Sequence, residues 1–283
     1  MSGVFEQFEY RLMKKLLLLA EKQKGKTGKN PMVAAAVYND FQHVISMASH
    51  QAEGSSHAEV LALNYAGSQA ENQHLMITLE PCTHVGSTPP CIEAIIRSKV
   101  KRVVYAVDDP NPNVRKNPAA ALLKEAGIQV VTPFMPDEAA NVNAVFFKNQ
   151  TTNLPFVTMK MALSLDGKIA PSNRHSQYLT GPRSLKQVHR LRREHDAILV
   201  GSGTISHDDP KLTVRYNLLK EGYSNPIQII LDPTLSCPLD AKLLRVSSSK
   251  TPETRVIFVC NNTIQTHALD AVSYTHLTLP TKA

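Results

Sequence analysis

Residues 56–63 read SHAEVLAL, an apolar helical pattern that opens with a histidine and a glutamate two residues apart. The apolar positions predict a helix over about 57–65 with one face in a core. His57 and Glu59 are not needed for such packing, and a lone histidine at a helix start is more often a cap or a surface residue. The meaning of the pair depends on a second motif that follows 25 residues later, at Cys82.

The second motif is PCTHVGSTPPC at 81–91, which follows the buried strand pattern HLMITLE at 74–80. His57, Cys82 and Cys91 form a three-ligand set for zinc that leaves the fourth tetrahedral position open. Zinc lowers the pKa of a bound water from about 15.7 to about 7, which makes it a nucleophile. Glu59 would act as general base and then general acid, as in zinc deaminases with a His-x-Glu and a Pro-Cys motif. His57 and Cys91 both fall at predicted helix starts, where the dipole favours thiolate.

Two alternatives stay open for this constellation. In the first, His84 supplies a fourth ligand and the zinc site is closed and structural; a structural site would have no use for Glu59. In the second, no metal binds, and Cys82 and Cys91 are small buried hydrophobic residues. His84 itself is either a substrate contact or a solvated loop residue.

Composition bounds the class of protein. The chain has 283 residues, of which 42% are hydrophobic and 19% charged, which suits one large domain or two ordinary ones. The net charge of +7 allows a phosphate-bearing partner or merely a basic surface. Basic and aromatic residues do not interleave, which disfavours nucleic acid. The early apolar run at 16–20 is too short for a signal peptide or a membrane span, so we expect a cytoplasmic protein with reduced thiols.

Hydrophobic periodicity predicts alternating elements in the first half. Helices are expected at 4–23, 57–65, 91–99, 119–127 and 137–150, and strands at 32–38, 43–49, 74–80, 101–107 and 128–133. A polar linker at 149–153 precedes a second α/β pattern that begins at 156–164. It continues with a helix at 182–195 and strands at 196–203, 226–232 and 255–260. The predicted domains are 1–150 and 151–272, and the tail SYTHLTLPTKA (273–283) looks foreign or artefactual.

Four motifs together resemble the bifunctional riboflavin-biosynthesis enzymes, in which a pyrimidine deaminase is fused to a reductase. They are NPMVAAAV (30–37), HAEV (57–60), TLEPCTHVGSTPPC (78–91) and DDPNP (108–112). The eight-residue gap between Cys82 and Cys91 is characteristic of that family, whereas cytidine and nucleic-acid deaminases typically have a gap of two. The second half is similar to the family's reductase domain in LPFVTMKMALSLDGKIA and LRREHDAILVGSGTISHDDPKLTVR.

The resemblance implies a cytidine-deaminase-like three-layer α/β/α domain followed by a partial dihydrofolate-reductase-like α/β domain. It implies hydrolytic deamination of 2,5-diamino-6-(5-phosphoribosylamino)pyrimidin-4-one and then NADPH-dependent reduction of its ribosyl group to ribityl. Zinc would be bound by His57, Cys82 and Cys91, with Glu59 as the proton shuttle. Substrate contacts are expected from Asn30, His50 and His84.

In the reductase half the resemblance places NADPH near Ala162, Tyr178, Thr204 and Asp208. It places the phosphorylated substrate near Ser176, Arg192, Leu212 and Arg215. Arginines suit a phosphate because the guanidinium can donate two parallel hydrogen bonds. Gly201 and Gly203, after a predicted strand, would let backbone approach a nucleotide.

The chain departs from the family pattern in several places. Ser87 stands where the family has a lysine or arginine that is expected to hold the substrate phosphate, Ala34 replaces a glycine, and VRKNPA (114–119) replaces a glycine-rich loop. A VEGG-like segment that completes the reductase site is missing. The alternatives are therefore a deaminase with an inert reductase half, or a non-catalytic zinc-stabilised binding protein. We expect a small phosphorylated pyrimidine as partner, no nucleic acid and no membrane, and leave homo-oligomerisation open.

Overall fold

The structure is a computed structural model that describes residues 2–86, 89–169, 179–220, 222–247 and 255–261. The chain divides into two compact units, Met1–Thr158 and Met159–Ala283, which are described separately. The predicted tail at 273–283 lies outside the described residues. The predicted boundary between 150 and 151 falls at the end of helix α7 (Ala144–Thr151), a few residues before the division between the units.

Unit 1 is built on a five-stranded sheet in the order β2-β1-β3-β4-β5. The strands are β1 (Ala34–Tyr38), β2 (Val44–Ser49), β3 (His74–Ile77), β4 (Arg102–Tyr105) and β5 (Gln129–Val131). β1 pairs antiparallel with both β2 and β3, whereas β3, β4 and β5 run parallel. The parallel strands therefore all end at one edge of the sheet, where loops from neighbouring strands meet.

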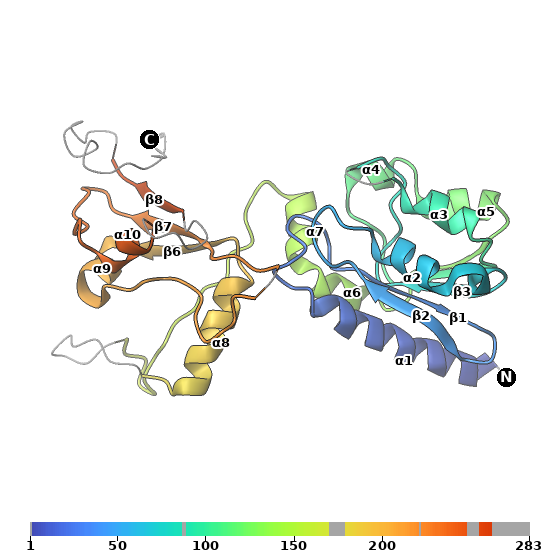
Figure 1. The fold of residues 1–283 in the computed structure, drawn as a ribbon, viewed down its shortest axis with the longest axis horizontal. Coiled ribbons are helices and arrows are strands. Elements are labelled where there is room, and N and C mark those ends of the chain that lie inside the picture. Colours follow the sequence, from blue (N-terminus) through green and yellow to red (C-terminus); the bar gives the residue numbers. More distant parts are fainter. Residues whose placement is uncertain (1, 87–88, 170–178, 221, 248–254, 262–283) are drawn as a thin grey trace. The chain divides into compact units, whose positions relative to one another are not determined.

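Helices cover both faces of this sheet and complete three layers (Figure 1). One core packs α2 (Ala58–Ala66), α3 (Cys91–Arg97) and α5 (Ala119–Glu125) on strand residues such as Val37 and Leu75. The other packs α1 (Ser2–Glu21) and α6 (Pro136–Val142) on the alternate strand residues, such as Ala36 and Met76. Successive strand side chains point to opposite faces, so the apolar strands feed both cores. The predicted α/β/α architecture is confirmed.

The single helix predicted over 137–150 is wrong, because the chain breaks into α6 and α7 at Asn143. The Asn143 side chain is buried; it accepts a hydrogen bond from the Met32 N–H (2.8 Å) and donates one to the Met32 carbonyl (2.9 Å). This pair joins the helix junction to the segment before β1. Helix periodicity alone could not reveal a partner 111 positions away in the chain. The short helix α4 (Pro112–Arg115) and the 3-10 turn Gly67–Ala70 were not predicted either.

Unit 2 contains a three-stranded parallel sheet in the order β6-β7-β8. Its elements are α8 (Pro182–Arg193), β6 (Ala197–Gly201), α9 (Ser202–Asp208), β7 (Ile227–Leu231), α10 (Lys242–Ser247) and β8 (Val256–Val259). Ile205, Ile230, Leu243 and Phe258 form its core. The strand–helix alternation confirms the α/β prediction for this half. α10 was not predicted, and the predicted strand at 196–203 stops at Gly201 because Ser202 begins α9.

Residues 156–164, which were expected to open the second α/β pattern, form neither helix nor strand. Val157 and Met159 are largely exposed, at 76% and 81%. An extended segment becomes a strand only when a neighbour pairs with its backbone groups, and within the described residues no strand pairs with this one. The apolar pattern at 156–164 therefore predicted a strand, but no described strand pairs with these residues.

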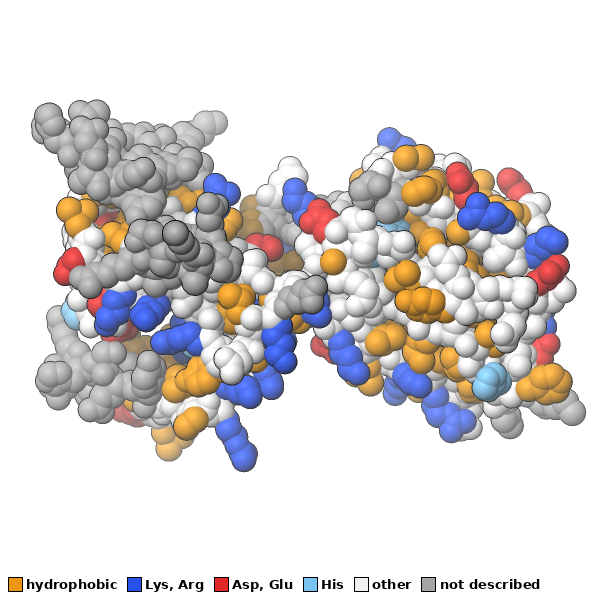
Figure 2. All heavy atoms as spheres, in the orientation of Figure 1, with side chains coloured by type: hydrophobic (Ala, Val, Ile, Leu, Met, Phe, Trp, Pro, Cys, Tyr) orange, Lys and Arg blue, Asp and Glu red, His pale blue; other side chains and the backbone are white. Residues whose placement is uncertain are grey.

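No helix among the described residues combines the length and apolar character that a membrane crossing requires. On the face drawn in Figure 2, the basic side chains of unit 1 are scattered among acidic and apolar ones.

A buried ion cluster joins α1 to the sheet. The Glu9 carboxylate binds the Arg102 guanidinium through both oxygens and also accepts a hydrogen bond from the Tyr38 hydroxyl. Glu9 and Tyr38 are buried, and the Tyr38 ring stacks on His74 with the ring centroids 4.9 Å apart. The first helix is thus held on β1, β3 and β4 by a charge pair away from water, where loss of one partner leaves the other charge uncompensated.

We expect Glu9→Gln to destabilise unit 1 by about 3 kcal/mol, because it leaves Arg102 without its counter-charge. Hydrogen-exchange protection of the β1 and β3 amides measures this free energy. Lys99→Ala, which removes the exposed pair of Lys99 with Glu71 (3.4 Å), is the control and should cost less than about 0.5 kcal/mol. Equal effects of the two substitutions would contradict the role given to Glu9.

Candidate metal centre and active site

Three potential metal ligands meet at the edge of the unit 1 sheet where the parallel strands end. His57 is the residue that precedes α2, Cys82 lies in the loop after β3, and Cys91 is the first residue of α3. Nδ1 of His57 is 3.0 Å from Sγ of Cys91 and 3.5 Å from Sγ of Cys82. One ligand atom from each residue lies within 4.8 Å of the other two.

The local backbone holds the two thiols together. The Cys91 N–H donates to Sγ of Cys82 (3.3 Å), and the Ile92 N–H donates to the Cys82 carbonyl (3.3 Å). Zinc bonds of about 2.0–2.3 Å keep nitrogen and sulfur ligands roughly 3.5 Å apart, close to the separation of His57 and Cys82. The donor set of one imidazole and two sulfurs therefore fits zinc.

Electrostatics favour a thiolate in this cluster. The pKa of Cys82 is lowered, first because the Cys91 thiol donates a hydrogen bond to it and then because of contact with His57. The pKa of Cys91 is raised by the same hydrogen bond and by burial. A deprotonated sulfur is the form that binds a metal, so Cys82 is prepared as a ligand.

Glu59 lies in the first turn of α2 with only 4% of its surface exposed. Burial, followed by the negative charge of Cys82, raises the pKa of Glu59 to about 7. Its carboxylate is within hydrogen-bonding reach of the Cys91 thiol. Glu59 is not one of the three clustered ligands, and a carboxyl group with a pKa near neutrality can both accept and release a proton.

The alternative of a closed site with His84 as fourth ligand finds no support in the part of the chain that the structure describes. The group of clustered ligand atoms there comprises His57, Cys82 and Cys91 and does not include His84. His84 instead lines the adjoining cavity, half-buried. A group with three ligands and a neighbouring cavity resembles a catalytic site more than a structural one.

A cavity of about 260 Å³ opens beside the three ligands. Its walls include the predicted residues Asn30, His50, His57, Glu59, Cys82 and His84. Sequence reasoning missed further wall residues, among them Lys29, Glu80, Asp109, Asn111, Phe146 and Gln150. Glu80 left a signal, since a charged residue at the end of an apolar strand is unusual unless it has a buried partner. Asp109 and Asn111 lie in the DDPNP motif that contributed to the family resemblance. Lys29, Phe146 and Gln150 left no signal, because they approach the site from separate segments.

Asn30 and His50 form a pair in the cavity wall. Nδ1 of His50 lies 3.2 Å from the Ser56 carbonyl oxygen, so Nδ1 carries the proton and Nε2 accepts from the Asn30 amide (3.3 Å). This bond leaves the amide oxygen of Asn30 for a ligand. The preceding turn needs Gly28, whose φ is +58° and where a Cβ atom would lie 2.3 Å from the Glu53 carboxylate.

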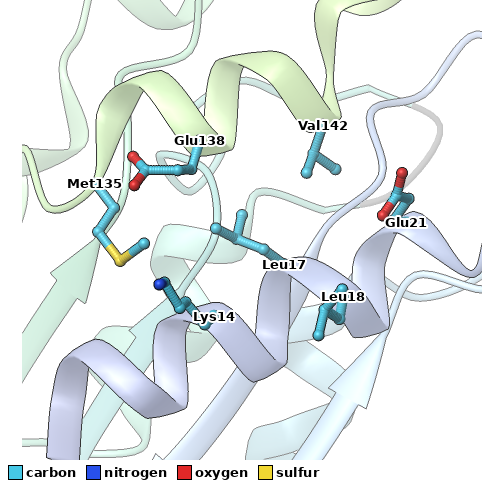
Figure 3. Close-up of a pocket in the computed structure, with 7 residues that line it drawn as sticks. All are labelled: Lys14, Leu17, Leu18, Glu21, Met135, Glu138 and Val142. Atoms are coloured by element: carbon cyan, nitrogen blue, oxygen red, sulfur yellow. The ribbon is translucent and has the colours of Figure 1, made fainter.

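A second cavity, of about 240 Å³, lies between α1 and α6 (Figure 3). Its walls are mostly apolar and contain neither histidine nor cysteine; they consist of Lys14, Leu17, Leu18, Glu21, Met135, Glu138 and Val142. The reactive side chains belong to the first cavity.

In unit 2 the predicted substrate residues Arg192, Leu212 and Arg215 come together around α8. The Arg192 guanidinium donates to the Thr213 carbonyl (3.1 Å), and the backbone N–H of Arg215 donates to Nδ1 of His189 (3.0 Å). Burial and the two arginines lower the pKa of His189 to about 4, so it accepts this bond as a neutral ring. The Leu212 side chain is buried in the core, so it can offer a ligand only its backbone. His189 was not predicted.

The predicted cofactor residues are brought together only in part. Thr204 and Asp208 are exposed and lie one turn apart on α9, which follows β6 directly. Ala162 lies in the irregular segment before α8, and Ser176 and Tyr178 lie outside the described residues. The end of a parallel strand that leads into a helix is where α/β folds bind nucleotides, so the position of Thr204 and Asp208 fits a nucleotide cofactor. A Cβ atom at Gly201 or Gly203 would meet nothing within 4 Å, so crowding does not require either glycine.

Comparison with known proteins agrees with this division of the chain. Residues 6–107 match the cytidine and deoxycytidylate deaminase zinc-binding region, and residues 155–277 match the RibD C-terminal domain. The riboflavin biosynthesis protein RibD of Aquifex aeolicus is 43% identical over 248 residues, which cover 88% of this chain and 68% of that protein. The chain belongs to the RibD family. RibD of Bacillus amyloliquefaciens is 41% identical, and the chain spans 62% of its length.

Solved structures of the RibD family show the same fold. RibD of Acinetobacter baumannii superposes with a TM-score of 0.84 at 34% identity, covering 98% of this chain and 75% of that one. A Thermotoga maritima protein superposes with a TM-score of 0.79 at 35% identity, covering 90% and 70%; it is described as a diaminohydroxyphosphoribosylaminopyrimidine deaminase/5-amino-6-(5-phosphoribosylamino)uracil reductase. The predicted deaminase-like and dihydrofolate-reductase-like folds are confirmed as those of this family.

We expect Cys91→Ser to reduce the zinc content from about one ion per chain to well below half, because a hydroxyl is a poor substitute for a thiolate ligand. Elemental analysis of the purified protein measures the content. Cys260→Ser, at a half-buried thiol of unit 2, is the matched control and should retain the metal. A Cys91→Ser protein that still held one zinc would show that the ion binds elsewhere.

Proposed function

We propose that this chain acts in riboflavin biosynthesis as a zinc-dependent deaminase of 2,5-diamino-6-(5-phosphoribosylamino)pyrimidin-4-one, with a second half that reduces the product with NADPH. The observation that carries the proposal is the cluster of His57, Cys82 and Cys91 beside the buried carboxyl of Glu59, next to a cavity that His57, Cys82 and Glu59 line. The name of the Thermotoga maritima relative supports both activities and the class of substrate.

In the deamination, water adds to C2 of the pyrimidine ring, the bond between C2 and its amino nitrogen breaks, and ammonia leaves as the C2 carbonyl forms. Zinc, when bound by the three ligands, would lower the pKa of the attacking water. Glu59 accepts a proton from the water on a carboxylate oxygen and returns it to the departing nitrogen. Asn30 and His50, joined by their hydrogen bond, orient the pyrimidine ring. His84 lines the same cavity and contacts the substrate.

NADPH, when bound, would supply a hydride to C1′ of the ribosyl group. The bond between C1′ and the ring oxygen breaks, and that oxygen takes up a proton, which gives the open-chain ribityl group. Thr204 and Asp208 on α9, with Ala162 and Tyr178, contact the cofactor. Arg215, which is exposed beside His189, and Arg192 contact the substrate phosphate together with Ser176 and the Leu212 backbone. Arg192 also supports the 213–215 segment through the Thr213 carbonyl, so it has a structural bond as well.

The cytoplasmic location, the partner and the two alternatives to this function remain predictions. The four cysteines are free thiols, which agrees with a reducing cytoplasm. The partner is a small phosphorylated pyrimidine, and homo-oligomerisation is open. The inert-reductase alternative predicts deamination without consumption of NADPH, and the non-catalytic alternative predicts zinc binding without release of ammonia.

The proposal predicts that the wild-type protein releases ammonia from the substrate and then oxidises NADPH in the same assay. Glu59→Gln should lower ammonia release by about 10²–10⁴-fold, because the proton shuttle is lost, and NADPH oxidation should fall with it. Zinc content of the variant should stay at about one per chain. A Glu59→Gln enzyme that turns over at the wild-type rate would refute the role of Glu59.

Lys29 is the candidate contact for the substrate phosphate in the deaminase cavity. Among the described residues that line this cavity it is the only lysine or arginine, whereas Glu59, Glu80 and Asp109 are acidic. Lys29 is exposed at the rim of the cavity and directly precedes Asn30, whose amide is hydrogen-bonded to His50. A cation at the rim would attract a phosphate while the ring lies inside beside Glu59.

We therefore expect Lys29→Ala to raise KM for the phosphorylated substrate about fivefold, because loss of an exposed ion pair of about 1 kcal/mol weakens binding by that factor. The KM of the dephosphorylated nucleoside should not change. Lys22→Ala, which removes an exposed lysine away from the cavity, is the control and should leave both values as in the wild type. An equal change in KM for both substrates would show that Lys29 does not recognise the phosphate.

A further inference from the structure

We propose that Glu80 is a positioning residue whose carboxylate ties both ends of the 108–118 loop to the segment after β3 that carries Cys82, and so sets one wall of the deaminase cavity. The inference rests on the proposed function, because the wall matters only if the cavity binds substrate. Glu80 belongs neither to the ligand cluster nor to the proton shuttle.

The contacts of Glu80 are with peptide groups on either side of the loop. One carboxylate oxygen accepts from the Asp109 N–H (3.0 Å), and the other accepts from the Ala119 N–H at the start of α5 (2.8 Å). The Glu80 N–H donates to the Val107 carbonyl (2.9 Å). Glu80 is 5% exposed, and a buried polar group whose hydrogen bonds are satisfied makes its surroundings rigid.

The loop between these two anchors carries residues that face the cavity. Asp109 and Asn111 both line it. An oxygen of Asp109 accepts from the Asn111 N–H (2.8 Å), and the Asn111 side chain in turn accepts from the Asn113 N–H (3.0 Å) where α4 begins. The positions of Asp109, Asn111 and α4 are therefore linked by successive bonds to the point where Glu80 holds the backbone.

The segment after β3 that contains Glu80 also positions the metal ligand Cys82. Glu80 is two residues before Cys82, whose carbonyl and sulfur are both held by the start of α3. Movement of the loop relative to Glu80 would change the distance between the wall and the ligands. A shifted wall weakens the binding of the substrate and of the transition state alike, which raises KM and leaves kcat nearly unchanged. If the Glu80 carboxylate served only stability, its loss would lower the free energy of unfolding and leave substrate binding unchanged.

The test is Glu80→Gln, which keeps the side-chain size but replaces one accepting oxygen with an amino group. We expect KM for the aminopyrimidine substrate to rise about tenfold with kcat within about threefold, because ground-state and transition-state binding are lost together. Hydrogen exchange at the Asp109 or Ala119 amide should become faster, and zinc content should stay at about one per chain. Glu80→Asp keeps both oxygens on a shorter arm and should give a smaller change; it carries the test if Glu80→Gln does not fold.

The matched control is Asp232→Asn in unit 2. Asp232 is also fully buried and accepts from two backbone N–H groups, those of Ser236 (3.0 Å) and Cys237 (2.8 Å). It should leave the deaminase KM unchanged. An unchanged KM in Glu80→Gln, or unchanged exchange at both amides, would overturn the inference. If the wild-type protein released no ammonia, the proposed function would fail, while the exchange measurement would still decide whether Glu80 holds the loop.

Discussion

The approach of one imidazole nitrogen to two sulfurs is the contact on which the first half of this protein depends. Nδ1 of His57 lies 3.0 and 3.5 Å from the sulfurs of Cys91 and Cys82. The three residues come from three separate segments, which the sheet brings to one edge. Cys82 follows β3, while His57 and Cys91 start helices that pack together on one face of the sheet. Because a metal site needs all three ligands at once, the sheet pairing and helix packing are preconditions for its chemistry.

The cavity beside the ligands is assembled from loops at that same edge. β3 and β4 are parallel neighbours, so the residues that follow them, Glu80 and Asp109, come within hydrogen-bonding distance. A different junction brings α7 to the site, because the amide of Asn143 exchanges two hydrogen bonds with the backbone of Met32. Buried polar side chains that bind backbone groups thus define the shape of the cavity, while the apolar cores beneath supply the stability.

The second half also has parallel strands whose ends lie side by side, but different side chains lie beside them. Three parallel strands end beside one another, and α9 begins where β6 stops. His189 and Arg192, three residues apart on α8, hold the backbone of the 213–215 segment from one side. Residues three apart share a helix face, so one helix positions the segment that carries Arg215. The membership of the RibD family accounts for the order of the two halves in one chain.

The sequence by itself predicted the ligand types, their positions at helix starts and after a strand, and a candidate general acid–base residue. Metal binding demands particular atoms, and periodicity shows which elements carry them. Only the tertiary structure decided the break at Asn143, the irregular conformation of residues 156–164 and the wall residues Lys29 and Glu80. These features depend on which backbone and side-chain groups meet from positions far apart in the chain. Such meetings follow from packing and hydrogen-bond satisfaction in three dimensions, which local patterns in the sequence do not contain.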